Sequence, residues 1–159
     1  MHHLLHSDES CRGFDTDAKI NPPLVSESKR KMLLTALQNG EIHTLTALHQ
    51  PNSDVYKDIT FYDASYGTTS IGEYLPLCYT YLVKSGIIDM PTLSRLTSYT
   101  PASQAGIIVP KVAVGEKANL ILFNPDESFN VEHHHSLYKQ ERLSGRVIMA
   151  IQGDEITRF

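Results

Sequence analysis

The sequence predicts an α/β fold, and three patterns in a chain of 159 residues support this class. Residues 26–38 place apolar side chains at helical spacing, which predicts an amphipathic helix. Residues 120–123 form a short apolar run, which predicts a buried strand. Residues 145–159 divide into two strand-like halves around Gly153 and Asp154, which predicts a hairpin.

The composition is that of a globular protein and excludes several function classes. The chain is 41% hydrophobic and 20% charged, with a formal net charge of -4, which argues against disorder. A mildly acidic chain has no electrostatic reason to bind nucleic acid or a membrane surface. No apolar run approaches the ~20 residues of a membrane span, and no signal peptide is visible. Cys11 and Cys78 are far apart, which predicts reduced thiols in a cytoplasmic protein.

The helical segments carry their own start and stop signals. The helix at residues 26–38 can be capped by Ser26 or Ser28, and Gly40 can end it. Ser70 and Glu73 have the spacing of a capping box, which predicts a helix from Ser70 to about Lys84.

A further helix is predicted near residue 100. Thr100 is the expected N-cap, and Pro101 then occupies the first helical position, where a missing N–H costs nothing. The C-terminal third of the chain changes character, with strands predicted at residues 120–123, 145–152 and 155–159.

The stretch from Thr44 to Asn52, T-L-T-A-L-H-Q-P-N, looks like the end of a buried strand entering a loop. In (β/α) barrels the chemistry lies at such strand ends. The stretch resembles the strand-eight motif of dihydroorotases, A-T-D-H-A-P-H. In that family the aspartate is the general base and the last histidine helps to bind substrate. Aligned on Pro51, Leu48 takes the aspartate's place, His49 the first histidine's and Asn52 the last histidine's.

A second, longer stretch carries the same resemblance. Residues 15–24, D-T-D-A-K-I-N-P-P-L, closely resemble the family's D-T-N-A-K-V-N-P-P-L-R, with Val25 in place of the arginine. The plainer alternative is a proline-ordered loop whose asparagine caps the next turn. Residues 64–67, A-S-Y-G, match the family's A-P-F-G, where backbone groups help to hold the substrate. The resemblance implies a substrate-binding set of Asn21, Asn52, Tyr66 and Gly67.

The resemblance also implies the fold: the C-terminal part of a (β/α)8 metal-dependent amidohydrolase barrel, followed by strands of the family's small β-sandwich domain. Residues 2–5, H-H-L-L, resemble the family's T-P-H-H-L-L at the end of strand six, so the chain is expected to begin in mid-barrel. Residues 115–125 resemble G-x-x-A-D-L-V-L-F-D-P of the sandwich. The expected division is barrel for residues 1–110 and sandwich for residues 111–159.

Zinc is the family's metal, but the resemblance places its ligands upstream of this chain. No cofactor and no metal ligand are therefore predicted here. His133, His134 and His135 are the densest histidine cluster. Successive residues of a strand point to opposite faces, so we expect a solvated loop, with adventitious nickel or zinc as the main risk. His49 is interpreted as a structural hydrogen bonder.

No catalytic residue is predicted, because Leu48 can neither support a metal-activated hydroxide nor shuttle its proton. Losing a general base alone removes a factor of ~10²–10⁴ in rate. The resemblance therefore implies a non-catalytic dihydroorotase-like protein of pyrimidine biosynthesis, a structural partner of aspartate carbamoyltransferase. The alternative is a fragment of an active zinc-dependent dihydroorotase or other cyclic amidohydrolase. Leu48, Asn52 and Val25 weigh against that alternative.

A partial barrel also has consequences for assembly. Closure removes the strand edges of a barrel, whereas a part of one leaves edges and apolar helix faces uncovered. We therefore expect the chain to self-associate, or to be covered by an N-terminal part of the same protein.

Overall fold

The computed structural model describes residues 1–159, which fold as two compact units. Unit 1 comprises residues 1–74 and 130–142, and unit 2 comprises residues 75–129 and 143–159. The barrel and sandwich boundary expected near residue 110 stays a prediction. Among the helices, none combines the length and the apolar character that crossing a membrane requires.

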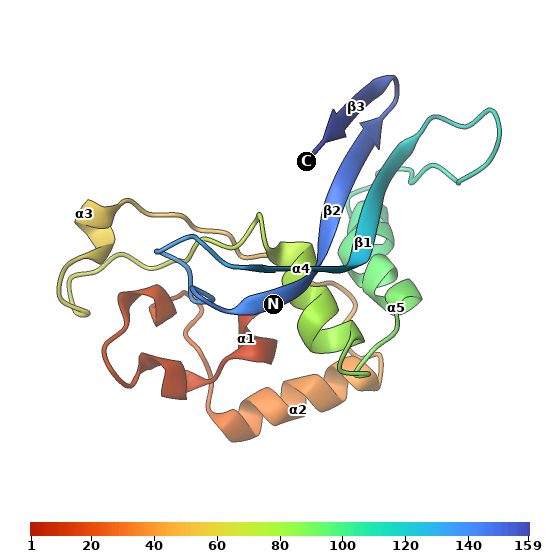
Figure 1. Cartoon of the computed structure of the whole chain (residues 1–159). Helices are drawn as coiled ribbons and strands as arrows, with labels where there is room; N and C mark the ends of the chain where they lie inside the picture. The colour runs from red at the N-terminus through yellow and green to blue at the C-terminus, as the bar shows by residue number, and fades with distance from the viewer. The chain divides into compact units, whose positions relative to one another are not determined.

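Unit 1 is built from short helices joined by long loops (Figure 1). Helix α2 confirms the expected helix: it follows Ser26, and Gly40 adopts a left-handed φ of 75° just after its end. Helix α1 packs against α2. The bounds are α1 His2–Leu5, η1 Asp8–Cys11, η2 Thr16–Ala18, α2 Glu27–Gln38 and α3 Asp54–Lys57. The apolar core includes Leu4, Ala18, Ile20, Leu24, Leu37, Leu45, Ala64, Val131 and Tyr138.

The expected strand in the Thr44–Asn52 stretch is wrong for this structure, because residues 41–53 form no regular element. The carbonyls of the stretch are satisfied by side chains instead of a ladder. The Tyr74 hydroxyl donates to the Leu45 carbonyl at 2.7 Å, and the Ser70 hydroxyl donates to the Ala47 carbonyl at 3.1 Å. The Gln50 N–H donates to the Thr68 carbonyl at 3.1 Å. These bonds hold the stretch extended without making it part of a sheet.

The helices that follow differ from the expected ones at their starts. The Ser70 hydroxyl donates to the Ala47 carbonyl, Glu73 Oε2 is buried without a hydrogen bond, and the helix begins only at Tyr74, so the predicted start at Ser70 is wrong. The next helix is capped by Asp89, whose carboxylate accepts from the Thr92 N–H at 2.9 Å. It continues past Thr100, which is therefore not a cap. The bounds are α4 Tyr74–Cys78, π-helical η3 Tyr79–Val83, α5 Met90–Ser94, π-helical η4 Arg95–Tyr99 and α6 Thr100–Gln104.

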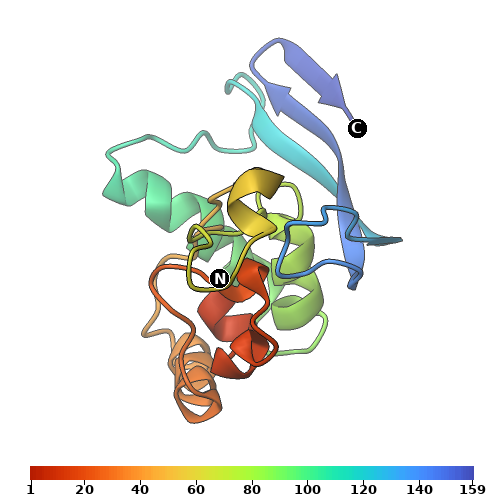
Figure 2. The ribbon, with the colours of Figure 1, turned by 90° about the vertical axis from the view of Figure 1, so that its left-hand side faces the viewer.

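Unit 2 also contains the one sheet of the structure, with strand order β1-β2-β3 (Figure 2). Strands β2 and β3 pair antiparallel from Met149–Arg158 to Gln152–Glu155, which confirms the predicted hairpin across Gly153 and Asp154. The bounds are β1 Asn119–Asn130, β2 Arg142–Gln152 and β3 Glu155–Arg158.

The apolar run at residues 120–123 lies in β1, but the expectation that it is buried is wrong. The side chains of Leu120, Ile121 and Leu122 are 36%, 53% and 39% exposed, and β1 is an edge strand of the sheet. Phe123 is the exception. Its ring lies edge-on to Tyr79, at 5.1 Å between centroids, and occupies the space where a side chain at Gly145 would stand.

A polar contact fixes the helical part of unit 2 to strand β2. The Ser144 N–H donates to the Thr80 hydroxyl oxygen at 2.9 Å, and the Lys84 ammonium donates to the Ser144 hydroxyl at 2.8 Å. Apolar side chains of the helices and of β2 form the core beside it, namely Leu77, Cys78, Leu82, Leu93, Leu96 and Leu143. Cys78 forms no disulfide, and burial raises the pKa of its thiol to about 12, so it is an inert core residue.

Candidate functional site

Leu48 faces apolar surroundings in unit 1. It packs against the buried cluster of Ala18, Ile20 and Leu24, and its backbone has a left-handed φ of 49°. A left-handed conformation is uncommon for leucine, so the surrounding packing must hold it. The place that a carboxylate takes in the resembling motif is therefore filled by a hydrocarbon side chain in contact with the core.

A fully buried histidine, His2, contacts the backbone at this position. Its Nε2 lies 3.4 Å from the Leu48 carbonyl oxygen and its Nδ1 lies 2.7 Å from the Tyr138 hydroxyl. A carbonyl only accepts, so Nε2 carries the proton and Nδ1 accepts from the tyrosine. Burial lowers the pKa of His2 to about 4, which keeps the ring neutral at pH 7. Both ring nitrogens are thus engaged inside the protein.

His49 is a structural hydrogen bonder, as the sequence predicted. Its Nδ1 accepts from the Ser70 N–H at 3.1 Å and from the Ile71 N–H at 3.2 Å. The side chain therefore satisfies the backbone of the turn that precedes α4. This use leaves one ring nitrogen, Nε2, for any other contact.

Three of the four residues in the predicted substrate-binding set lie together. The Asn52 amide donates to the Tyr66 carbonyl at 3.0 Å and to the Gln50 carbonyl at 3.2 Å. The Gly67 N–H donates to the Lys19 carbonyl at 2.9 Å, which ties the same loop to the segment that carries Asn21. Asn21 is exposed. The geometry assigns Asn52 a role in holding the loop, and the binding of a substrate by the set stays a prediction.

Gly67 is required at its position by both backbone and space. Its φ is 126°, which side-chain-bearing residues rarely adopt, and a Cβ there would overlap the Gln50 carbonyl oxygen. The close approach of the 66–67 loop to the Gln50–Asn52 segment therefore depends on the absence of a side chain.

Lys57 is a buried ammonium that the sequence did not single out. It is 1% exposed, and its Nζ donates to the Thr16 carbonyl at 2.8 Å and to the Ser65 carbonyl at 3.1 Å. Burial lowers its pKa from the ordinary value. The lysine joins α3, η2 and the 64–67 loop. A single lysine in a polar stretch shows no sequence pattern that predicts burial, so periodicity could not have identified Lys57 as buried.

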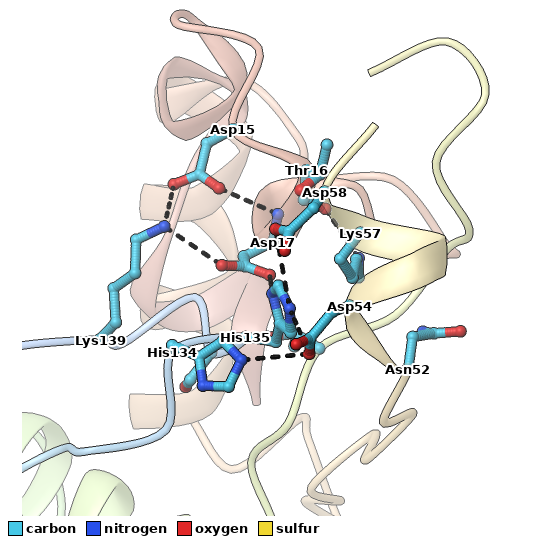
Figure 3. Close-up of polar contacts among 12 residues, drawn as sticks. Asp15, Thr16, Asp17, Asn52, Asp54, Lys57, Asp58, His134, His135 and Lys139 are labelled. Carbon is cyan, nitrogen blue, oxygen red and sulfur yellow. Dashed lines mark hydrogen bonds and ion pairs between the residues drawn. The ribbon is translucent and has the colours of Figure 1, made fainter. Parts of the chain in front are cut away.

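A histidine–aspartate cluster, made of Asp54, His134 and His135, joins α3 to the loop of residues 131–141 (Figure 3). The Asp54 Oδ1 atom lies 3.2 Å from His134 Nε2 and 3.1 Å from His135 Nε2. The hydrogen bond from His134 holds the pKa of Asp54 below its usual range.

The expectation of a solvated loop at His133–His135 is wrong for His135, whose side chain is only 11% exposed. The alternation argument fails because these residues belong to a turn instead of a strand, so two neighbouring rings converge on one carboxylate.

Asp17 stands behind this cluster and is itself buried, with a side chain 3% exposed. Its Oδ2 accepts from the Lys139 ammonium at 3.2 Å, and Lys139 also pairs with Asp15 at 3.3 Å. The other oxygen, Oδ1, has no hydrogen bond and lies 3.5 Å from His135 Nδ1 (Figure 3). The buried carboxylate is thus directed at the inner nitrogen of the His135 ring.

Comparison with known proteins connects this chain to dihydroorotases. It is 30% identical to the dihydroorotase of Ruminiclostridium cellulolyticum over 149 residues, which is 92% of this chain and 35% of that protein. It is also 30% identical to a dihydroorotase-like protein of Pseudomonas aeruginosa over 163 residues, covering 99% of this chain and 38% of the relative. The chain spans about a third of the length of the curated relatives it matches. No protein-family model matches it.

Solved structures show the same fold. L-Hydantoinase (dihydropyrimidinase) from Arthrobacter aurescens superposes with a TM-score of 0.89 and 21% identity, over 99% of this chain and 38% of that one. The inactive dihydroorotase-like domain of the Chaetomium thermophilum CAD-like multifunctional protein superposes with a TM-score of 0.69 and 16% identity, over 98% of this chain and 41% of that one. The neighbours are amidohydrolase (β/α)8 barrel proteins, and this chain has the fold of part of one.

These barrels form a metal-dependent class, and the residues around Leu48 do not fit its zinc. Leucine offers no donor atom, the ring of His2 uses both nitrogens within the core, and His49 uses Nδ1 on backbone N–H groups. Zinc in proteins takes thiolate, imidazole or carboxylate ligands with free lone pairs. This motif therefore lacks the set of donor atoms that a zinc ion needs.

Proposed function

We propose that this chain is part of a non-catalytic dihydroorotase-like protein of pyrimidine biosynthesis, acting in the cytoplasm as a structural partner of aspartate carbamoyltransferase. The observation that carries the proposal is Leu48, which stands at the motif's carboxylate position and packs into the apolar cluster of Ala18, Ile20 and Leu24. A hydrocarbon at this point can neither accept a proton nor hold a metal.

Two further observations support the non-catalytic half of the proposal. His2, whose ring contacts the Leu48 carbonyl, is buried and neutral, with both nitrogens in hydrogen bonds. Asn52 uses its amide on the carbonyls of Gln50 and Tyr66. Among the structural neighbours, an inactive dihydroorotase-like domain of a multifunctional protein has the same fold over 98% of this chain.

A turnover assay tests the loss of catalysis. Hydrolysis of dihydroorotate and cyclisation of carbamoyl aspartate should both be undetectable for the whole protein that contains this chain, with and without added zinc, while an active dihydroorotase assayed in parallel turns over. Leu48→Asp should stay inactive as well, because one carboxylate supplies no activated hydroxide. Turnover by the unmodified whole protein would overturn the proposal.

The partner half of the proposal needs its own experiment. Sedimentation of the chain with aspartate carbamoyltransferase of the same organism should give a joint boundary that neither protein gives alone. Separate sedimentation at every ratio would reject the partnership and leave the question of catalysis untouched.

The alternative function is that of an active zinc-dependent cyclic amidohydrolase, of which this chain is a part. The names of the relatives favour it, since several proteins about 30% identical to the chain are named dihydroorotase. It predicts turnover by the whole protein once zinc is supplied, because the family's zinc ligands are expected upstream of this chain, so an assay of the whole protein separates the two functions.

A further inference from the structure

We propose that the histidine–aspartate cluster of Asp54, His134 and His135 is a zinc-binding site that clips helix α3 to the 131–141 loop. The site lies apart from the Leu48 motif and goes beyond the proposed function. Two imidazoles and one carboxylate are a donor set that zinc uses, whereas magnesium and calcium prefer oxygen ligands alone.

The spacing of the donor atoms suits a tetrahedral ion. One ligand atom from each of the three residues can be chosen so that all three lie within 4.8 Å of one another. Asp54 Oδ1 is 3.2 Å from His134 Nε2 and 3.1 Å from His135 Nε2. Ligands about 2.0–2.1 Å from a tetrahedral zinc lie about 3.3 Å apart. The exposed side chains of Asp54 and His134 can make the small adjustment that remains.

His135 is held in the orientation that a metal ligand requires. The buried Asp17 carboxylate directs Oδ1 at His135 Nδ1 from 3.5 Å, which leaves Nε2 facing outward to Asp54. The backbone is fixed too, because the His135 carbonyl accepts from the Thr69 N–H at 3.1 Å. Histidine ligands of zinc commonly donate their other N–H to a carboxylate in this way, which fixes the tautomer and the ring.

The acceptor atoms at this site outnumber the donors available to them, which favours a bound cation. Asp17 Oδ1 is buried without a hydrogen bond, and the Nδ1–H of His135 is the donor within reach. With that proton on Nδ1, the Nε2 atom is an acceptor, and it faces the Asp54 carboxylate at 3.1 Å. Two acceptors at this distance need a proton or a metal ion between them. His134 brings a second imidazole nitrogen to the same carboxylate oxygen, so a metal ion at this point would have three protein ligands.

A fourth ligand is within reach on the same side of the cluster. Asp58 Oδ1 lies 3.8 Å from His135 Nε2, and the Asp58 N–H bonds to the Asp54 carbonyl at 2.7 Å, which places the two carboxylates one turn apart. A water molecule or Asp58 can therefore complete the tetrahedron. The nearby ammonium of Lys139 is paired with Asp15 and Asp17, so it does not neutralise Asp54 or Asp58.

Cobalt titration of the full chain after chelator treatment tests the site, because tetrahedral cobalt(II) gives a visible absorption band. We expect saturation at one equivalent, and loss of the band when zinc is added. Asp54→Asn and His135→Gln should each weaken cobalt binding by at least about 100-fold, and Asp17→Asn by about 10-fold through the orientation of His135. Zinc should also raise the thermal midpoint of the unmodified chain and not that of Asp54→Asn.

The matched control is His133→Gln, which removes a histidine from the same run outside the cluster. It should bind cobalt like the unmodified chain. Equal weakening by His133→Gln would show adventitious binding to a flexible histidine run and would overturn the site, as would the absence of a tetrahedral band. Circular dichroism checks that the variants fold, and Asp54→Asn, at an exposed side chain, decides the outcome if Asp17→Asn unfolds. No dihydroorotate is used, so the result is independent of turnover.

Discussion

Unit 1 and unit 2 differ in their content of histidines and of buried polar side chains. All eight histidines of the chain belong to unit 1, and unit 2 has none. Buried polar side chains follow the same division: unit 1 contains, among others, His2, Asp17 and Lys57, whereas unit 2 contains only Ser144.

Unit 2 differs in its apolar surface as well. Large apolar side chains are exposed on all three strands of its sheet, including Leu120, Ile121, Leu122, Ile148 and Ile156. Unit 1 is therefore expected to depend on pH and on individual hydrogen bonds. Unit 2 is expected to depend on apolar contacts and on whatever covers its sheet.

Mild acid should produce the largest difference in stability between the two units. Burial lowers the pKa of His2 and of His6 to about 4, and for His6 the positive charge of Arg30 adds to the lowering. The unfolded state then takes up protons first as pH falls from about 6.5 to about 4. Stability is complete above this window, and within it each histidine lowers the free energy of unfolding by about 1.4 kcal/mol per pH unit, which is roughly 3 kcal/mol per histidine across the whole window.

Hydrogen exchange at pH 7, 6 and 5, followed separately over each unit, measures this effect. Protection should fall with pH in unit 1 and much less in unit 2. His6→Asn should remove about half of the slope in unit 1. The exposed His43, replaced by glutamine, serves as the control and should change nothing. An unchanged slope in His6→Asn would contradict the assignment.

Gly67→Ala should be the most damaging single substitution in unit 1. The φ of 126° and the overlap of a new Cβ with the Gln50 carbonyl together should lower the free energy of unfolding by about 3 kcal/mol. Gly40→Ala is the matched control, because it also has a positive φ, of 75°, but meets open space. Urea unfolding should rank Gly67→Ala well below Gly40→Ala. Equal costs would show that the close approach to Gln50 does not matter.

Lys57→Met should cost less, about 2 kcal/mol. The substitution leaves the buried carbonyls of Thr16 and Ser65 without their donor, although it also removes the cost of burying a charge. Lys31→Met, at a side chain 71% exposed, is the control and should lie within about 0.5 kcal/mol of the unmodified chain. Unfolding curves that coincide for the two variants would mean that the Lys57 ammonium contributes nothing net.

The sequence could predict features that depend on a local pattern of residues. Patterns with a period were recovered, such as helix α2 and the β2–β3 hairpin. The motif analysis placed Asn21, Asn52, Tyr66 and Gly67 in one substrate-binding set, and the structure brings Asn52, Tyr66 and Gly67 together, while the binding of a substrate stays a prediction.

Features that depend on contacts distant in sequence were missed. The cluster joins Asp54 to residues 80 and 81 positions away, and the burial of Lys57 depends on a carbonyl 41 positions away. Leu120 to Leu122 were expected to be buried because apolar runs usually are, but burial depends on the covering elements and not on the run itself.

The smallest change in stability, with a clear change in assembly, should come from the sheet of unit 2. Strand β1 is an edge strand of 12 residues, and exposed edges with apolar side chains tend to pair. We expect the chain to self-associate through this sheet.

Ile121→Thr, at a side chain 53% exposed, should change the free energy of unfolding by less than about 0.5 kcal/mol yet weaken the association. Ile108→Thr is the control, because Ile108 is 90% exposed but lies outside the sheet. Sedimentation over a wide range of protein concentration measures both variants. A compact monomer down to nanomolar protein, or equal weakening by Ile108→Thr, would show that the exposed sheet does not make the contact.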